Sequence, residues 1–379
     1  MGGHKALFLH SEDLETFGYP ESCPFSTKRA GLARKKLESI GMLSPEEIYT
    51  PAAISRRTIS KFHPLGYLDL LEKAETGDLG VELFAIGLGT PETPIFRGMV
   101  AYAMLACGAT AAGVDLLLSG KADIVFNPSG GYHHAAPQRA SGFCYLNDVG
   151  LACQLLTEAG KRVLYLDVDV HHGDGVQDFF YDRKDVLTVS LHESGKKLFP
   201  GTGFENDIGT GVGKGYSVNV PLPPGTFDEV YMSAFREIVP PLIRLNDPDV
   251  IVLELGMDAL SGDPLADLEL TNNTYGDVLH EVMKFKKPLL ATGGGGYHVR
   301  NTVRGWALIW SIMTDRDHSE ELSAGMGGIL MESTEWQGGL RDRRIVQDVS
   351  SESEIRDRIE QTVQTVRKNI FPYHETPAE

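Results

Sequence analysis

Cysteine is scarce in this chain, which has four cysteines among 379 residues and no C-x-x-C pair. So few cysteines cannot form the disulfide framework of a small secreted protein, and we expect a reducing, cytoplasmic location. Basic residues are also outnumbered, because 35 Lys and Arg face 52 Asp and Glu and the net charge is −17. That balance argues against nucleic acid as a partner and is compatible with a basic substrate such as a lysine-rich peptide.

Long apolar runs, repeats and low-complexity linkers are lacking too. No apolar run reaches the ~18–20 residues of a membrane span, so we expect no membrane partner. The N-terminus, MGGHKALFLHSEDLETF, is a poor signal peptide, and its MGG resembles a myristoylation start without a basic patch behind it. The chain is 42% hydrophobic, which suffices for a large core, and we expect a single domain over residues 1–379.

Short apolar runs alternate with segments of helical periodicity. The runs typical of strands are KALFLH, ADIVFNP, VLYLDVDV, VLTVSLH, DVIVLELG and KPLLATGG. The helical segments are 29–40, 96–118, 145–159, 227–245, 275–284 and 302–312, with a charged helix over 352–369. SPEE at Ser44 predicts a capped helix start. The alternation predicts an α/β fold, with a mainly parallel central sheet covered by helices on both faces.

Four of the strand-like runs lead into polar or glycine-rich sequence. The segments that follow them are SGGYHHA, HHGDG, MDALSGDP and GGGGYH. Open parallel sheets bind ligands beyond the carboxyl ends of their strands. We therefore expect histidine, aspartate, glycine and tyrosine residues to meet at one edge of the sheet.

The stretch LYLDVDVHHGDGV places polar groups at alternate positions of an apolar strand. Asp167, Asp169 and His171 would share one face, because side chains alternate across a strand. Buried carboxylates are costly without a compensating positive charge. A divalent cation such as Zn²⁺ accepts carboxylate and imidazole together, and Asp258 is the third candidate ligand. The alternative is that these acids cap loops or pair with arginine, but the alternation favours a metal.

Two further motifs would reach the same edge. His133 and His134 mean little as neighbours alone, but Asp167 and Asp174 are available to orient their rings. The four glycines before Tyr297 form either a flexible loop or a segment of close backbone approach. In the second case, the Tyr297 phenol could donate a hydrogen bond to a developing oxyanion.

Six motifs in this order resemble the zinc-dependent histone deacetylase family, and the bacterial acetoin-utilisation deacetylases most of all. They are GGYHHA, GFCYLNDV, LDVDVHHGDGV, LFPGTG, LELGMDALSGDPL and GGGGYH. The resemblance covers about residues 4–312 and leaves 313–379 as a C-terminal extension without an assigned role. It implies the single-domain arginase–deacetylase fold and a cytoplasmic hydrolase that deacetylates lysine in proteins or peptides. Metabolic enzymes such as acyl-CoA synthetases are the implied substrates.

The resemblance also assigns roles to residues. The implied zinc ligands are Asp169, His171 and Asp258, with Fe²⁺ as an alternative metal in the cell. The implied catalytic residues are His134 as general base and acid with its partner Asp174, His133 with its partner Asp167, and Tyr297. His172 is not a ligand in the family.

The remaining implied residues surround this centre. Structural K⁺ or Na⁺ is implied at Asp167, Asp169, His171, Ser190 and Leu191, and at an outer site of Phe180, Arg183, Val186 and Tyr216. The implied substrate-binding residues are Gly142, Phe143, Phe199 and Glu92. Glu92 stands where eukaryotic members carry a substrate-gripping aspartate. Arg29 matches the arginine of an internal acetate channel.

Three other functions fit parts of the pattern. An acetylpolyamine amidohydrolase would use the same scaffold and a narrower entrance. An arginase-like hydrolase would need ligands for a second metal. A non-enzymatic acyl-lysine-binding protein is disfavoured, because every catalytic residue type is present.

Overall fold

Eight parallel strands form the centre of the molecule. The computed structural model describes residues 4–77, 80–317, 340–343 and 349–375. The strands are β1 (Ala6–Leu9), β2 (Ile48–Tyr49), β3 (Ile124–Asn127), β4 (Val163–Asp167), β5 (Val186–Glu193), β6 (Ser217–Leu222), β7 (Val250–Glu254) and β8 (Leu289–Thr292). Their order is β2-β1-β3-β8-β7-β4-β5-β6, and every adjacent pair is parallel. The predicted α/β class with a parallel sheet is confirmed.

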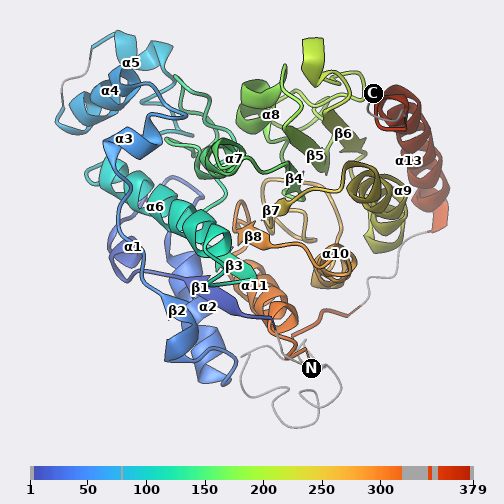
Figure 1. The fold of residues 1–379 in the computed structure, drawn as a ribbon, viewed down its shortest axis with the longest axis horizontal. Coiled ribbons are helices and arrows are strands. Elements are labelled where there is room, and N and C mark those ends of the chain that lie inside the picture. Colours follow the sequence, from blue (N-terminus) through green and yellow to red (C-terminus); the bar gives the residue numbers. More distant parts are fainter. Residues whose placement is uncertain (1–3, 78–79, 318–339, 344–348, 376–379) are drawn as a thin grey trace.

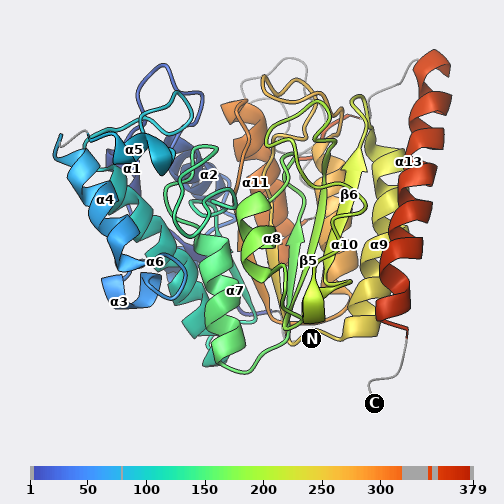
Figure 2. The ribbon, with the colours of Figure 1, turned by 90° about the horizontal axis from the view of Figure 1, so that it is seen from above.

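Helices cover both faces of this sheet (Figures 1 and 2). One face carries α6 (Met99–Leu118), α7 (Asp148–Glu158) and α8 (Asp174–Phe180). The other carries α2 (Lys28–Ser39), α9 (Asp228–Asn246), α10 (Asn272–Met283) and α11 (Val299–Met313), and α13 (Val349–Ile370) packs beside α9 and β6. Short elements are α1 (Asp13–Thr16), α3 (Arg56–Ile59), α4 (Leu65–Glu75), α5 (Glu82–Ala85), η1 (Pro45–Glu47), η2 (Gly211–Gly213) and η3 (Phe371–Tyr373).

The central strands are apolar on both sides because each side meets a helical layer. In β4, Leu164 and Leu166 enter one hydrophobic cluster, whereas Val163 and Tyr165 enter the cluster on the opposite face. Full burial of one such aliphatic side chain stabilises the fold by about 1.5–3 kcal/mol. The same strand therefore joins two cores and ends where polar residues begin.

The helix α6 corrects one expectation from the sequence. It is long and apolar enough to cross a membrane by length and composition, although no run of that length was expected. Two thirds of the most apolar segment of this helix is buried inside the fold, and the helix packs on α7, β3 and β8. A Cβ atom on Gly113 would lie 2.7 Å from Leu290 Cδ1, so the helix contacts the sheet closely. It is packed as a core helix of the α/β fold.

The predicted elements are found with shifted ends. The predicted helices 29–40, 96–118, 145–159, 227–245, 275–284 and 302–312 correspond to α2, α6, α7, α9, α10 and α11, and 352–369 lies within α13. The start at Ser44 is a 3-10 turn with a complete Ser44–Glu47 capping box. The prediction that the strand continues to His171 is wrong, because β4 ends at Asp167. Residues 1–3, and residues 318–339, 344–348 and 376–379 of the predicted C-terminal extension, lie outside the described residues.

Candidate metal centre

The polar segments meet at the carboxyl ends of four neighbouring strands, as predicted. These strands are β3, β8, β7 and β4, which lie side by side in the centre of the sheet. The loops that leave them carry His133 and His134, Tyr297, Asp258, and Asp169 with His171. The sheet therefore brings together side chains from positions more than 160 residues apart.

Asp169, His171 and Asp258 form a buried group with the spacing of metal ligands. One ligand atom of each lies within 4.8 Å of the others. His171 Nδ1 is 3.2 Å from Asp169 Oδ1 and 3.0 Å from Asp258 Oδ2. The backbone fixes both carboxylates, because His171 N–H donates to Asp169 Oδ1 and Val170 N–H donates to Asp258 Oδ1. Backbone hydrogen bonds of the loop after β4 therefore hold this group, although the sequence predicted that the strand itself would continue to His171.

The electrostatics of this group favour a bound cation. Burial and the nearby Asp169 carboxylate raise the pKa of Asp258 to about 7. Burial would lower the pKa of His171, but hydrogen bonds to Asp169 and Asp258 raise it to about 10. The Asp169 and Asp258 carboxylates therefore share one positive charge. Without a metal ion, protonated His171 supplies that charge. Two oxygen donors and one nitrogen donor fit a catalytic Zn²⁺ site with one open position.

The glycine run of GGGGYH allows close backbone approach to these ligands. A Cβ atom on Gly295 would overlap Asp258 Oδ2, and one on Gly256 would overlap Asp169 Oδ2. Gly295 N–H donates to Asp169 Oδ2 at 2.7 Å. Of the two interpretations of this run, close approach is the one that the geometry supports.

The two adjacent histidines are held by different carboxylates. His134 Nδ1 is 2.7 Å from Asp174 Oδ1, His133 Nδ1 is 2.9 Å from Asp167 Oδ2, and the two Nε2 atoms are 3.0 Å apart. Burial and the positive charge of His133 lower the pKa of His134 to about 4. Burial opposes protonation of His133, but the surrounding carboxylates raise its pKa well above the ordinary value. His134 is therefore the neutral imidazole of the pair and His133 the cationic one.

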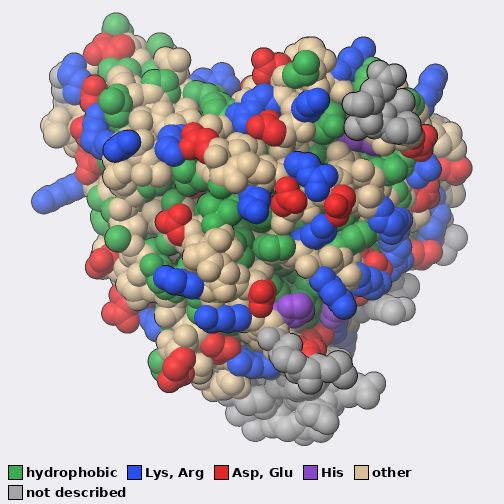
Figure 3. Space-filling view, viewed as in Figure 1, with side chains coloured by type: hydrophobic (Ala, Val, Ile, Leu, Met, Phe, Trp, Pro, Cys, Tyr) green, Lys and Arg blue, Asp and Glu red, His purple; other side chains and the backbone are tan. Residues whose placement is uncertain are grey.

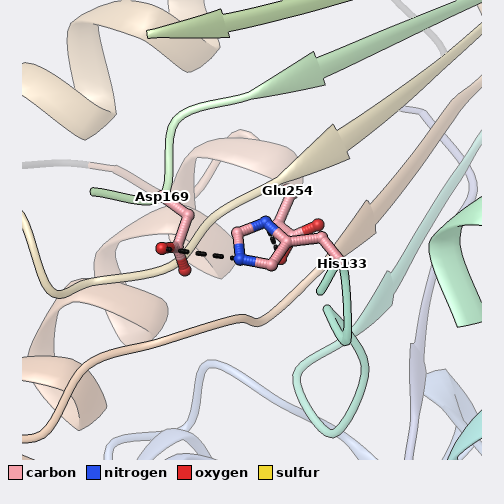
Figure 4. Close-up of side chains that lie close together, drawn as sticks. All are labelled: His133, Asp169 and Glu254. Atoms are coloured by element: carbon pink, nitrogen blue, oxygen red, sulfur yellow. Dashed lines mark ion pairs between the residues drawn. The ribbon is translucent and has the colours of Figure 1, made fainter. Parts of the chain in front are cut away.

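Glu254 belongs to this network, although the sequence analysis missed it. It ends β7 directly beside Asp167, and the Tyr165 hydroxyl lies 2.6 Å from Glu254 Oε2 and 2.8 Å from Asp167 Oδ2. In Figure 4 the His133 ring lies between Asp169 and Glu254. His133 Nδ1 is 3.2 Å from Glu254 Oε1 and Nε2 is 3.9 Å from Asp169 Oδ1. The available signal was an acid at the end of an apolar strand, as at Asp167.

His133, Asp169 and Glu254 also have a spacing compatible with a metal ion. However, each ring nitrogen of His133 faces a different carboxylate, so the imidazole itself supplies the compensating charge. This is the only other such group in the described part of the chain. The geometry therefore favours one metal and not the two of an arginase-like site.

A second set of missed residues holds the loop that carries both histidines. Asn147 Nδ2 donates to the carbonyl oxygens of His133 and Ala135 at 3.1 and 2.9 Å. His63 Nε2 in turn accepts the Asn147 N–H at 2.8 Å, and His63 Nδ1 donates to Pro137 O at 3.0 Å. Asn147 lies in the motif GFCYLNDV, but nothing in the sequence connects this motif with His63, which is distant in the chain.

Tyr297 lies beside the metal group on the backbone anchored by Asp263. Its N–H donates to Asp263 Oδ2 at 2.7 Å, and its ring centroid is 6.3 Å from that of His171 and 5.6 Å from that of Phe143. Burial, followed by the charges of Asp258 and Asp169, raises the pKa of the Tyr297 phenol well above its usual range. The phenol is therefore neutral and can donate a hydrogen bond.

The predicted substrate-binding residues surround these side chains. The Phe199 ring lies 5.0 Å from the His134 ring, and a Cβ atom on Gly142 would overlap His134. Phe143 has a left-handed backbone with φ of 64°, and its N–H donates to Glu92 O at 3.1 Å. Glu92 thus supports Phe143 through its main chain, and the residue is exposed.

Arg29, predicted to line an acetate channel, lies under the glycine loop. Its guanidinium donates to Gly294 O and Gly296 O, both at 2.8 Å, and lies over the rings of Phe25 and Trp306. In this structure Arg29 therefore holds the backbone that precedes Tyr297.

The predicted monovalent-cation residues fall in two places. Asp167 and Ser190 are neighbours on β4 and β5, and Leu191 follows Ser190. The outer set, Phe180, Arg183, Val186 and Tyr216, lies at the end of α8 and the starts of β5 and β6. His172 Nδ1 bonds to Thr202 Oγ1 at 2.8 Å and is not part of the ligand group.

Comparisons with known proteins agree with this geometry. The family model described as "Histone deacetylase domain" matches residues 23–313. The chain is 40% identical to histone deacetylase 8 of Xenopus tropicalis, over 78% of this chain and 80% of that protein. It is 38% identical to acetoin utilization protein AcuC of Bacillus subtilis, over 84% of each. The crystal structure of an HDAC homolog from Aquifex aeolicus superposes with a TM-score of 0.85 at 30% identity, covering 95% of this chain and all of that one.

Proposed function

The chain belongs to the histone deacetylase family of metal-dependent amidohydrolases, and we propose that it hydrolyses the acetyl amide of acetyl-lysine in proteins to lysine and acetate. The observation that supports this most is the single buried site shared by Asp169, His171, Asp258, His134 and Tyr297. In it, three ligand side chains, a neutral imidazole and a neutral phenol lie side by side.

We propose Asp169, His171 and Asp258 as the ligands of Zn²⁺, or of Fe²⁺ in the cell. When bound, such an ion polarises the amide carbonyl and makes water more acidic. The side chains of the protein then direct the protons. The hydrogen bond from His134 Nδ1–H to Asp174 leaves Nε2 as the basic nitrogen, which in this structure faces His133 Nε2 at 3.0 Å. We propose that water takes the place of this contact and that His134 Nε2 then accepts its proton. His134 next donates that proton to the departing lysine nitrogen, so that the amide C–N bond breaks to give acetate and amine.

Tyr297 and the aromatic walls complete the site. The phenol donates to the oxygen that becomes negative as water attacks, and one such donor typically lowers the barrier by ~3–4 kcal/mol. His133, held by Asp167 and Glu254, adds a fixed positive charge beside His134. Phe143 and Phe199 offer apolar surface to a neutral acetyl-lysine stem and less to the charged lysine product, which favours product release.

The natural substrates that we propose are metabolic enzymes such as acyl-CoA synthetases, in the cytoplasm. The name of the Bacillus subtilis relative, which refers to acetoin utilization, supports a metabolic role. The four cysteines are all free and buried, which is consistent with a reducing compartment. We also propose K⁺ or Na⁺ at the two predicted monovalent sites as structural ions.

The test is activity on a panel of acylated lysine peptides and acetylpolyamines, with and without a chelator. We expect chelator-sensitive hydrolysis of acetyl-lysine peptides and one divalent ion per chain by metal analysis. Faster turnover of acetylpolyamines would favour the small-amine alternative. Binding of acetyl-lysine without any turnover in the metal-loaded protein would favour a non-enzymatic role.

A further inference from the structure

A cleft of about 710 Å³ opens beside the catalytic side chains and is not used by the mechanism above. Two residues connect it to the site. Asp174 pairs with His134, and the ring of Phe199 packs against the His134 ring. Its walls come from α5 and the loop after it, the 139–141 loop, α8 and the 199–207 loop. Figure 1 shows α5 and α8 in the upper part of the molecule, with the 139–141 loop region between them.

The charges that line this cleft are unbalanced. Four carboxylates, those of Glu92, Asp174, Asp178 and Asp207, face one guanidinium, that of Arg139. Figure 3 shows acidic and basic side chains interspersed over one face of the molecule. The cleft thus concentrates negative charge next to the catalytic site.

Asp178 contributes a carboxylate with no assigned partner. It is exposed on α8 and makes no hydrogen bond or ion pair to any residue that the structure describes. Its pKa lies above the ordinary value, first because of partial burial and then because of the Asp174 carboxylate, which Arg139 offsets only in part. A cation placed in the cleft would relieve this repulsion.

One wall of the cleft carries an exposed aromatic side chain. Phe84 of α5 lines it and is 71% exposed, and Val81 just before it is 85% exposed. Exposed aromatic side chains at the rim of a concave site are typical anchors for a partner chain.

We propose that this cleft binds the substrate segment on one side of the acylated lysine, with Arg or Lys facing Asp178 and Asp207 and an apolar residue on Phe84. The inference rests on the proposed function, because the acyl-lysine has to enter the neighbouring tunnel. The cleft is continuous with the catalytic site through Asp174 and Phe199, so residues next to the acyl-lysine can reach it. Its negatively charged walls favour a basic peptide segment.

The experiment compares acetyl-lysine peptides that differ only in the flanking residues, which are Arg-rich, Glu-rich or uncharged, with a minimal acetyl-lysine having blocked ends. We expect kcat/KM to be roughly tenfold higher for the Arg-flanked than for the Glu-flanked peptide at low salt. The double variant Asp178→Asn, Asp207→Asn should reduce this ratio severalfold, and Phe84→Ala should lower kcat/KM for peptides with an apolar flank. Asp182→Asn, an exposed change outside the cleft, should keep the wild-type ratio.

The outcomes separate this proposal from the proposed function. Equal kcat/KM for both flanks, with normal hydrolysis of the minimal substrate, would overturn the cleft proposal alone. If no acyl-lysine substrate is hydrolysed, the proposed function fails, and fluorescence anisotropy of the same labelled peptides decides on the cleft. Tighter binding of the Arg-flanked peptide, lost in the double variant, supports the cleft, and equal binding overturns it.

Discussion

At the scale of single residues, the Tyr297 hydroxyl is the group whose loss removes one hydrogen bond and little else. Tyr297→Phe keeps the ring that packs near Phe143 and His171. We expect turnover to fall by about a hundredfold or more, because one oxyanion donor is lost. Steady-state kinetics with a metal analysis of the same sample checks this. Unchanged turnover would remove Tyr297 from the mechanism.

Asp258 makes a second prediction at this scale. Asp258→Ala removes one of the three proposed ligands and leaves the buried His171 with Asp169 alone. We expect metal occupancy to fall greatly, as measured by metal analysis after dialysis against a limited metal supply. Asp277→Ala on the exposed side of α10 is the matched control and should retain full occupancy. Full stoichiometry in Asp258→Ala would refute the ligand set.

At the scale of elements, the sequence predicts position better than extent. Alternation in LYLDVDV correctly indicated a buried strand, but β4 ends at Asp167 and the metal group lies in the loop beyond it. Side chains also alternate along extended loop backbone. The sequence pattern therefore does not indicate where the hydrogen bonds between strands stop. The strand β6 was missed because Ser217 and Asn219 interrupt its apolar character, although both are buried.

Some residues belong to the site through partners that are distant in the chain, so residue type and local pattern did not indicate their roles. Glu254 acquires a role only because β7 pairs in register with β4, and His63 only because it meets Asn147. Local motifs contain no signal for such contacts. By contrast, the proposed ligands and the two histidines could be recognised by residue type. The strand pattern also predicted the sheet edge at which they lie.

The glycine loop gives the prediction that belongs to this scale. A methyl group on Gly295 has no space beside Asp258 Oδ2, so Gly295→Ala has to displace either the loop or the Asp258 side chain. We expect activity and metal affinity to fall by at least tenfold, with the rest of the fold intact by circular dichroism. Gly66→Ala in α4, where nothing lies within 4 Å, is the control and should leave both unchanged. Normal metal affinity in Gly295→Ala would show that the loop is flexible after all.

At the scale of the whole molecule, the loop of the two histidines depends on a titratable group in another part of the fold. His63 is fully buried and bonds as a neutral imidazole, with Nδ1–H donating to Pro137 O and Nε2 accepting from Asn147 N–H. Burial lowers its pKa to about 4, against an ordinary value of 6.5. Protonation would place a second N–H against that of Asn147, so the native state resists binding this proton.

The consequence is a loss of stability in acid whose direction follows from that shift. Above pH 6.5 neither state binds the proton. As the pH falls from 6.5 toward 4, the unfolded chain protonates while the native state does not, so the free energy of unfolding decreases. Below about pH 4 this contribution levels off, and its full size is on the order of 3 kcal/mol.

Urea unfolding of the wild type and of His63→Gln at several pH values between 4 and 7.5 measures this contribution. Glutamine can still accept the Asn147 N–H but does not titrate. We expect the variant to be less stable at pH 7.5, since it cannot also reach Pro137 as histidine does, and the difference to shrink steadily as the pH falls. His4→Gln, at an exposed position, is the control for the loss of a histidine outside this loop. If the difference in the free energy of unfolding for His63→Gln does not change with pH, protonation of His63 does not contribute to the loss of stability in acid.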